Sequence, residues 1–256
     1  MSDLKLVLTD LDGTVAPHAR HEISDAVRQA IIDVENKGIV VAAVTGRPYD
    51  FSKQALNVLG ISGLCVVDGG ATIVDTQTEE IVWKQWLSAA RTKAIIEAIL
   101  PYSDAIIYTT GVNILDADMI DTNLITEDTA NIFALIDPTK EHDLVQELDA
   151  IEGIDYYVLD GVHPFTFEPH RAVQINDHQA TKHHGVEALR EILHIPIEQT
   201  LAIGDGDNDI ALFRSAAIKV AMGNATEGLK KNADFITATL NEDGFVQAMQ
   251  KYILND

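Results

Sequence analysis

The chain of 256 residues is long enough for one large domain or for a core with a second lobe, and its 46% hydrophobic and 23% charged residues exclude a wholly disordered protein. Its net charge of −22, from 18 Lys and Arg against 40 Asp and Glu, repels phosphate backbones and anionic headgroups, so we expect no nucleic-acid partner and no membrane partner. A single cysteine, Cys65, excludes an internal disulfide and a thiolate-held zinc site.

The amino-terminal segment shows no targeting signal. The first ten residues include acidic residues and only about six apolar ones, far short of the basic lead and apolar region of a signal peptide. No later stretch approaches the roughly 18 consecutive apolar residues of a membrane span. The sequence therefore predicts a cytoplasmic protein.

The first predicted elements alternate between strand and helix. Residues 4–8 form an apolar run that ends in a polar loop, which predicts a buried strand. From Ser24 the apolar positions repeat with the helical period, with Ser24 as the N-cap and Gly38 as the terminator. Residues 39–44 are again an unbroken apolar run, which ends at Thr45. Runs that are apolar on both faces are typical of parallel strands covered by helices on each side.

Three further apolar runs follow the same pattern. Each of them ends in a polar loop that contains glycine; they are residues 64–67, 200–203 and 218–221. Repeated strand and helix units of this kind indicate an α/β fold with a doubly wound, Rossmann-like parallel sheet.

The middle of the chain has a different pattern. Helix-like stretches near residues 88–100 and 140–150 alternate with short strand-like segments. These segments are residues 105–109, 112–115, 156–159 and 165–167. This mixture predicts a smaller α+β domain inserted into the core. We place the core at residues 1–84 and 174–256 and the insertion at residues 85–173.

Several polar residues stand where the predicted parallel strands end, and ligands bind at this edge of a doubly wound sheet. They are Asp10, Asp12, Thr14, Thr45, Asp68, Asp205 and Asp209. Two carboxylates about 4 Å apart repel by about 4 kcal/mol at an effective dielectric of about 20, so a cluster of them needs a cation to stay ionised. Oxygen ligands without cysteine or clustered histidine favour magnesium.

Four motifs resemble those of the haloacid dehalogenase superfamily and stand in the same order. They are DLDGT from Asp10 to Thr14, Thr45 in VTGRP, Lys182 in ATKHHGVEAL, and GDGDND from Gly204 to Asp209. The first and the last motif are specific, whereas a lone threonine or lysine is not. The insertion between the second and third motifs is similar to that of the Cof-like phosphatases, whose α+β cap lies over the active site.

The resemblance implies a role for individual residues. Asp10 would attack phosphorus and form an aspartyl-phosphate, while Asp12 would act first as general acid and then as general base. Magnesium would be held by Asp10, by the backbone carbonyl of Asp12 and by Asp205. Thr45 and Lys182 would bind the phosphoryl group.

Two more residues, Asn208 and Asp209, would support the metal through water or by orienting its ligands. The resemblance thus implies a magnesium-dependent phosphatase that hydrolyses a small phosphorylated metabolite, for example a sugar phosphate. Asp12 favours hydrolysis, because relatives that keep the phosphoenzyme for other purposes usually replace this acid. A phosphomutase of the same superfamily and a non-catalytic phospholigand-binding protein stay open as alternatives.

Some of these residues also have ordinary structural explanations. Asp209 could cap the helix that follows it, Thr45 could bond within its own loop, and Lys182 could lie on the solvated surface. We leave Asp68 outside the predicted site. The pair His183-His184 follows Lys182 where the relatives usually have a glycine, and no sequence-close carboxylates or cysteines complete a histidine metal site.

Overall fold

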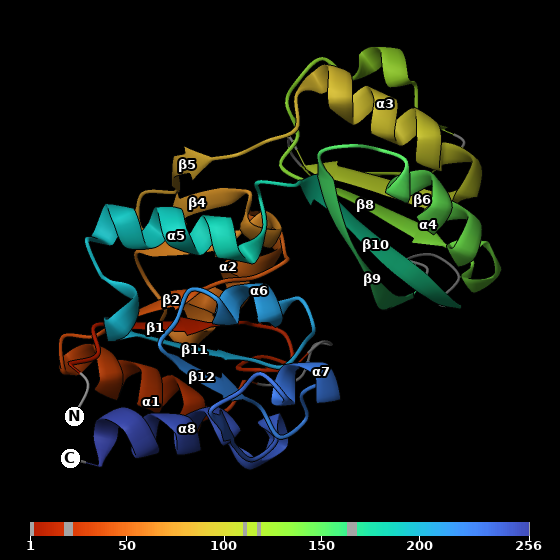
Figure 1. Cartoon of the computed structure of the whole chain (residues 1–256). Coiled ribbons are helices and arrows are strands. Elements are labelled where there is room, and N and C mark those ends of the chain that lie inside the picture. Colours follow the sequence, from red (N-terminus) through yellow and green to blue (C-terminus); the bar gives the residue numbers. More distant parts are fainter. Residues whose placement is uncertain (1–2, 18–22, 110–111, 117–118, 163–167, 256) are drawn as a thin grey trace. The chain divides into compact units, whose positions relative to one another are not determined.

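The computed structural model describes residues 3–17, 23–109, 112–116, 119–162 and 168–255 (Figure 1). The chain divides into two compact units. Residues Met1–Trp83 and Lys182–Asp256 form one of them, which we call the core unit, and Lys84–Thr181 form the other, which we call the inserted unit.

The core unit is built on a five-stranded sheet with the strand order β13-β12-β11-β1-β2. Its strands, which all pair in parallel, are β1 (Leu6–Thr9), β2 (Val40–Ala43), β11 (Thr200–Gly204), β12 (Ile218–Ala221) and β13 (Phe235–Ile236). Every residue of the two neighbouring strands β1 and β11 is buried. This agrees with the predicted α/β class, because only a sheet covered on both faces buries its strands completely.

Helices lie on both sides of this sheet (Figure 1). Those of the core unit are α1 (Asp25–Asn36), α2 (Tyr49–Leu59), α5 (Lys182–Leu193), α6 (Asp209–Phe213), α7 (Glu227–Lys230) and α8 (Gly244–Met249). Helix α1 begins as predicted, because the Ser24 hydroxyl oxygen accepts a hydrogen bond from the Ala26 N–H at 3.2 Å. The same hydroxyl donates to Asp243 Oδ1 at 2.7 Å, which joins the start of α1 to the start of α8.

One predicted parallel strand has a different place. β3 (Leu64–Val67) lies in a separate three-stranded sheet with β4 (Thr72–Asp75) and β5 (Glu80–Lys84), and it pairs antiparallel with β4. A single parallel bridge, between Val44 and Val66, connects it with the end of β2. The antiparallel pairing of β3 with β4 follows from the tight turn at Asp68–Gly70, which sends the chain directly back along β3.

The inserted unit contains an antiparallel sheet with the strand order β7-β6-β8-β10-β9 and two helices. Its elements are α3 (Ala89–Ile99), β6 (Ser103–Thr109), β7 (Val112–Asp116), β8 (Ile132–Ile136), α4 (Glu141–Asp149), β9 (Ile154–Val162) and β10 (Pro169–Asp177). Buried residues of both helices, among them Ile96 and Leu144, pack with Ile106 and Val173 of the sheet in one hydrophobic cluster. The inserted unit therefore has a core of its own.

The two predicted helices of the insertion correspond to α3 and α4, whereas its strands and its boundary differ in part from the prediction. The predicted segment 165–167 lies outside the described residues. Strands β8 and β10 were not predicted. The compact unit extends to Thr181, because the chain continues along β10, which stays paired with β9 as far as Asp177, and the boundary at residue 173 stays a prediction.

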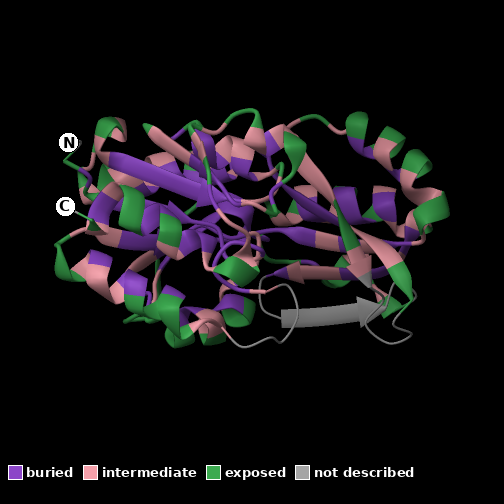
Figure 2. Cartoon of the chain, turned by 90° about the horizontal axis from the view of Figure 1, so that it is seen from below, coloured by how far each residue is buried: buried purple, intermediate pink, exposed green. Residues whose placement is uncertain are grey.

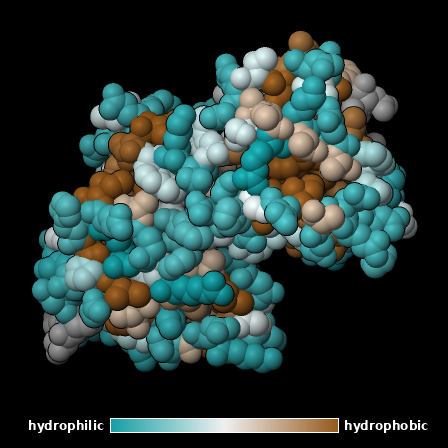
Figure 3. Space-filling view, turned by 45° about the horizontal axis from the view of Figure 1, so that its top comes forward, coloured by the Kyte–Doolittle hydropathy of each residue, from teal (hydrophilic) through white to brown (hydrophobic). Residues whose placement is uncertain are grey.

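The distribution of side chains follows the two cores. Figure 2 shows the buried residues concentrated in the strands and on the inner faces of the helices. The face of the molecule in Figure 3 is largely hydrophilic, as 40 acidic residues would lead one to expect. In the described part of the chain, no helix combines the length and the apolar character needed to cross a membrane.

Candidate active site

The carboxyl end of β1 leads directly into the loop that carries Asp10. Asp10 follows Thr9, the last residue of the strand, and its N–H donates to the Ile203 carbonyl of β11 at 3.0 Å. This bond continues the ladder between two central strands, so the sheet itself fixes the backbone of Asp10. The carboxylate lies in the interior, with the side chain only 8% exposed.

The carboxyl end of β11 carries a second loop with two acidic residues, Asp205 and Asp209. Asp209 Oδ2 accepts hydrogen bonds from the N–H groups of Asp205 and Gly206, at 2.9 and 3.0 Å. The carboxylate therefore folds this loop back on itself and does not cap α6, where Asn208 holds the N-cap position without a side-chain cap bond. Gly204 is required here, because a β-carbon would overlap the Asp209 carboxylate.

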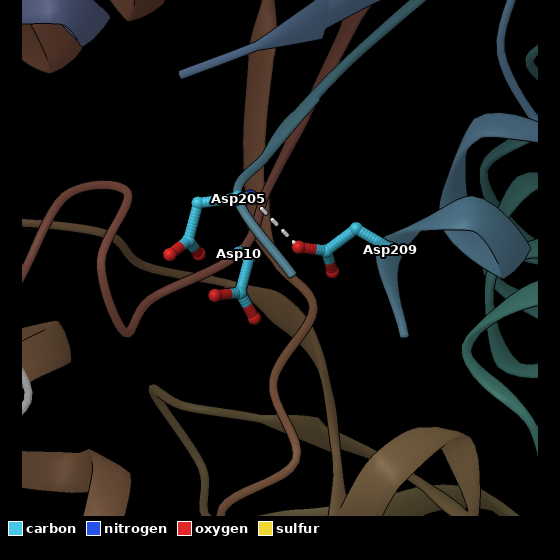
Figure 4. A group of neighbouring side chains, drawn as sticks. All are labelled: Asp10, Asp205 and Asp209. Atoms are coloured by element: carbon cyan, nitrogen blue, oxygen red, sulfur yellow. Dashed lines mark hydrogen bonds between the residues drawn. The ribbon is translucent and has the colours of Figure 1, made fainter. Parts of the chain in front are cut away.

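Three carboxylates meet at this edge of the sheet, as Figure 4 shows. One oxygen each of Asp10, Asp205 and Asp209 lies within 4.8 Å of the others. At this separation, two charged carboxylates repel by about 3 kcal/mol in an effective dielectric of about 20. The cluster therefore needs positive charge close by.

Lys182 supplies part of that charge. Its Nζ lies 2.6 Å from Asp10 Oδ1 and 2.6 Å from Asp209 Oδ1, and its side chain is only 3% exposed. Burial alone lowers the pKa of the lysine, but the charges of Asp10 and Asp209 outweigh this effect and raise the pKa above its usual value. The ammonium therefore stays charged although it is buried.

Asp10 experiences the opposite balance. Burial raises the pKa of its carboxyl well above the ordinary value, Lys182 opposes this shift, and Asp209 and Asp205 add to it. A further cation next to Asp10 would favour the ionised carboxylate.

The cluster fits a hard divalent cation. Three carboxylates and one ammonium leave two negative charges unbalanced, and all three donors are oxygen atoms. Gly13 has a φ of +76° and leaves the space that Asp205 occupies, since a β-carbon there would overlap its carboxylate. Thr14 Oγ1 and Asn224 Nδ2 donate to the two oxygens of Asp205 at 3.2 and 3.4 Å, which orients them.

Asn224 is a site residue that the sequence analysis did not identify. Its Nδ2 also donates to the Gly13 carbonyl at 2.9 Å, and its Oδ1 accepts from the Leu240 N–H at 2.8 Å. The side chain thus joins the DLDGT loop to the loop after β12. The available signal was its place just beyond a parallel strand, where the other site residues also lie.

The side chain of Asp12 is engaged by an arginine. Arg47 Nε donates to Asp12 Oδ2 at 2.7 Å, and Arg47 Nη2 donates to Asp12 Oδ1. The hydrogen bond and the charge of Asp12 raise the pKa of Arg47, although burial acts in the opposite direction. Sequence reasoning gave no role to Arg47, although it stands in VTGRP two residues after Thr45.

Thr45 lies at the carboxyl end of β2, the strand next to β1. It is 1% exposed, and its Oγ1 accepts a hydrogen bond from the Arg47 N–H at 3.1 Å. The backbone of Asp68, which we left outside the predicted site, lies against the same loop: its N–H donates to the Arg47 carbonyl at 2.9 Å. The Thr45 hydroxyl is thus held by its own loop with its oxygen as acceptor.

The histidine pair beside Lys182 has a different environment. His183 Nδ1 lies 2.7 Å from Ser215 Oγ, and burial lowers the pKa of the imidazole. The His184 ring lies 5.4 Å from the His183 ring, measured between centroids. Among the described residues, the group of Asp10, Asp205 and Asp209 that could hold a metal ion includes no histidine.

The chain is similar to known proteins over almost its whole length. The model of the family described as haloacid dehalogenase-like hydrolase matches residues 7–249. The chain is 26% identical over 253 residues to the 5-amino-6-(5-phospho-D-ribitylamino)uracil phosphatase YcsE of Bacillus subtilis (strain 168), with 98% of this chain and 97% of the relative covered. It is 26% identical over 257 residues to a phosphoglycolate phosphatase of Methanobrevibacter smithii, with 98% and 100% covered.

A solved structure of similar fold is that of a haloacid dehalogenase-like hydrolase from Bacteroides thetaiotaomicron. The TM-score is 0.79, the sequence identity is 26%, and 97% of this chain and 99% of that chain are covered. The similarity extends over almost the whole chain and so includes the core unit and the inserted unit.

Proposed function

Because the chain belongs to the haloacid dehalogenase-like hydrolases, we propose that it is a magnesium-dependent phosphatase that hydrolyses a small phosphorylated metabolite through an aspartyl-phosphate on Asp10. The observation that carries this proposal is the cluster in which the carboxylates of Asp10, Asp205 and Asp209 lie together and Lys182 contacts Asp10 and Asp209. Two relatives, at 26% identity each, are named as phosphatases of small phosphorylated compounds, which supports the substrate class.

In the first chemical step, an oxygen of Asp10 forms a bond to phosphorus while the bond between phosphorus and the ester oxygen breaks. The carboxyl group of Asp12 gives its proton to the departing oxygen. In the second step, the Asp12 carboxylate takes a proton from a water molecule as that water attacks phosphorus. Inorganic phosphate leaves, and the Asp10 carboxylate and the protonated Asp12 are restored.

Lys182 would hold Asp10 in position and stabilise the charge of the transferred group. Its contact with Asp10 Oδ1 fixes the orientation of the carboxylate, and its ammonium stays charged when buried. Thr45 would donate its hydroxyl hydrogen to a phosphoryl oxygen, since its oxygen accepts from Arg47. Positioning and charge stabilisation of this kind account for most of the catalysis of phosphoryl transfer.

Asp10, Asp205 and the backbone carbonyl of Asp12 would hold the magnesium ion, with Asn208 and Asp209 in support. When bound, the ion would offset the repulsion between the Asp10 carboxylate and the phosphoryl oxygens. We also propose that the inserted unit, residues 85–173 by sequence and Lys84–Thr181 by structure, is a cap that selects the substrate.

The proposal is tested by measuring phosphate release from a library of phosphate monoesters, with magnesium and with a chelator. We expect hydrolysis of some esters with magnesium only, and none by Asp10→Asn. Asp50→Asn is a matched control, because this exposed carboxylate lies in the first turn of α2. Phosphate release by Asp10→Asn would exclude the covalent route. An isomerised sugar phosphate would indicate a phosphomutase, and ligand binding without turnover would indicate a binding protein.

A further inference from the structure

The ion pair between Asp12 and Arg47 joins the loops that follow two neighbouring strands, β1 and β2. Two nitrogens of the guanidinium, Nε and Nη2, each contact a different oxygen of the same carboxylate. A contact at two points fixes both the position and the rotation of a carboxylate, which a single ammonium cannot do. The pair therefore specifies the orientation of Asp12.

The backbone of Arg47 is held on both sides. Its N–H donates to Thr45 Oγ1 at 3.1 Å, and its carbonyl accepts from the Asp68 N–H at 2.9 Å. The remaining nitrogen of the guanidinium, Nη1, lies 3.5 Å from the Phe51 carbonyl. Arg47 is thus attached to its own loop and to the first turn of α2, so it can act as a fixed support for Asp12.

Folding stability is a poor explanation for this pair. The side chains of Arg47 and Asp12 are 28% and 25% exposed, and ion pairs near solvent contribute little to stability. Asp12 is not a member of the group of Asp10, Asp205 and Asp209, whose carboxylate oxygens lie within 4.8 Å of one another. A carboxylate two residues after Asp10 could turn toward that group if nothing held it elsewhere.

We propose that Arg47 is a positioning residue for Asp12, an inference that rests on the proposed function. The two-point contact keeps the Asp12 carboxyl apart from the acidic cluster and in the orientation needed for proton transfer. The guanidinium holds Asp12 as an ionised carboxylate, which is the form that takes a proton from water in the second step. To act as the acid of the first step, this carboxylate must first take up a proton, so its orientation affects the hydrolysis of the aspartyl-phosphate directly and its formation through the proton it then carries. Arg47 acts through Asp12 and does not contact the substrate.

A double-mutant cycle in kcat separates this role from substrate binding. With p-nitrophenyl phosphate as the substrate, we expect Arg47→Met to lower kcat about 10- to 100-fold, because small displacements of a catalytic group have effects of this size. The KM should change less than about threefold. In the Asp12→Ala background, the same substitution should lower the remaining rate less than about twofold, because only the smaller electrostatic interaction of Arg47 with Asp10 is left.

Two further variants are measured beside the cycle: a conservative substitution of Arg47 and a control at another cation. Arg47→Lys keeps the charge but offers one contact point, so its kcat should lie between those of the wild type and Arg47→Met. Lys53→Met removes another cation of the core unit, one that pairs with Glu79, and should keep the wild-type kcat. Equal effects of Arg47→Met with and without Asp12 would overturn the proposal, and so would a large rise in KM alone.

A second measurement does not depend on turnover. In the NMR spectrum of the arginine side chains, the Nε–H signal that disappears in Arg47→Lys should shift in Asp12→Ala. An unchanged signal would show that the pair is absent in solution and would overturn the proposal even if the enzyme is active. A wild-type protein that releases phosphate from no ester would overturn the proposed function and, with it, this role. If the effects of Arg47→Met and Asp12→Ala on kcat were additive in an active enzyme, the role of Arg47 would be overturned and the proposed function would stand.

Discussion

Lys182 lies between two buried carboxylates, and we therefore expect its removal to affect stability as well as activity. Removal of its ammonium would leave Asp10 and Asp209 close together in the interior without their shared counter-charge. Loss of one partner of a buried ion pair costs about 3 to 5 kcal/mol. We therefore expect Lys182→Met to lower the free energy of unfolding by about 3 kcal/mol in urea denaturation without added metal.

The control for this prediction is Lys53→Met, which breaks a solvent-exposed pair with Glu79. Exposed pairs contribute between about 0 and 1 kcal/mol, so the control should unfold close to the wild type. Equal stability of the Lys182→Met and Lys53→Met variants would contradict the view that the buried ammonium balances the two carboxylates.

Cys65 provides a second prediction at this scale. Burial raises the pKa of its thiol to about 12, against an ordinary value near 9. A raised pKa means that the folded protein holds the proton more tightly than the unfolded chain does. The stability from this group is therefore complete below about pH 9 and is lost as the pH rises toward 12, by about 1.4 kcal/mol for each pH unit.

We expect the free energy of unfolding of the wild type to fall more steeply between pH 9 and pH 10 than that of Cys65→Ala, measured in urea. A thiol reagent should react slowly with the folded protein, because the Cys65 thiol is buried. In denaturant it should react with one thiol per chain, because Cys65 is the single cysteine. Rapid reaction of the folded protein at pH 8 would show that the thiol is accessible.

The sequence indicated some site residues and not others, for a physical reason. Asp10, Asp205 and Lys182 stand in motifs at the ends of strands or at the start of a helix, so their positions follow from the order of elements. The roles of Arg47 and Asn224 depend on which loops are neighbours. That information lies in the sheet order and in side-chain rotamers, which a local pattern does not contain.

At the scale of elements, the helical period predicted α1 well, because apolar and polar residues alternate clearly there. In α1, the buried residues are Val27, Ala30, Ile31 and Val34, which repeat with the helical period that the sequence shows from Ser24. The N-cap of this helix supports a prediction. Ser24→Ala removes the bond to the Ala26 N–H and the bond to Asp243, and N-cap losses of this kind cost about 1 kcal/mol.

Urea denaturation should therefore show a loss of about 1 kcal/mol for Ser24→Ala. Gln29→Ala on the same helix is the control, because Gln29 is exposed and bonds only to Asp33 among its described partners. A surface substitution of this type changes stability by less than about 0.5 kcal/mol. If the two variants were equally stable, the cap would not contribute to the stability of α1.

Strands were harder to place than helices. The apolar run of β3 looks like a run of the parallel sheet, yet the turn at Asp68–Gly70 gives it an antiparallel partner. Asp68 and Gly69 both have positive φ, at 55° and 71°, and this local conformation decides the direction of the chain. A strand pattern predicts burial, whereas the partner strand depends on such turns and on contacts that are distant in sequence.

At the scale of the whole molecule, the chain has two hydrophobic cores, one in each unit. Leu144 of α4 and Ile31 of α1 are both fully buried, the first in the inserted unit and the second in the core unit. Replacement of such a residue by alanine costs about 2 to 5 kcal/mol. Because each cluster packs within its own unit, the substitution should destabilise the unit that contains it more than the other unit.

Hydrogen exchange measured by mass spectrometry tests this expectation. Leu144→Ala should speed exchange in α3, α4 and β6 to β10 and leave the strands of the core unit protected, and Ile31→Ala should give the reverse pattern. The two variants serve as controls for each other. Uniform acceleration over both units in either variant would show that the cores unfold together. The domain division would then describe geometry alone and would not mark two separate stability units.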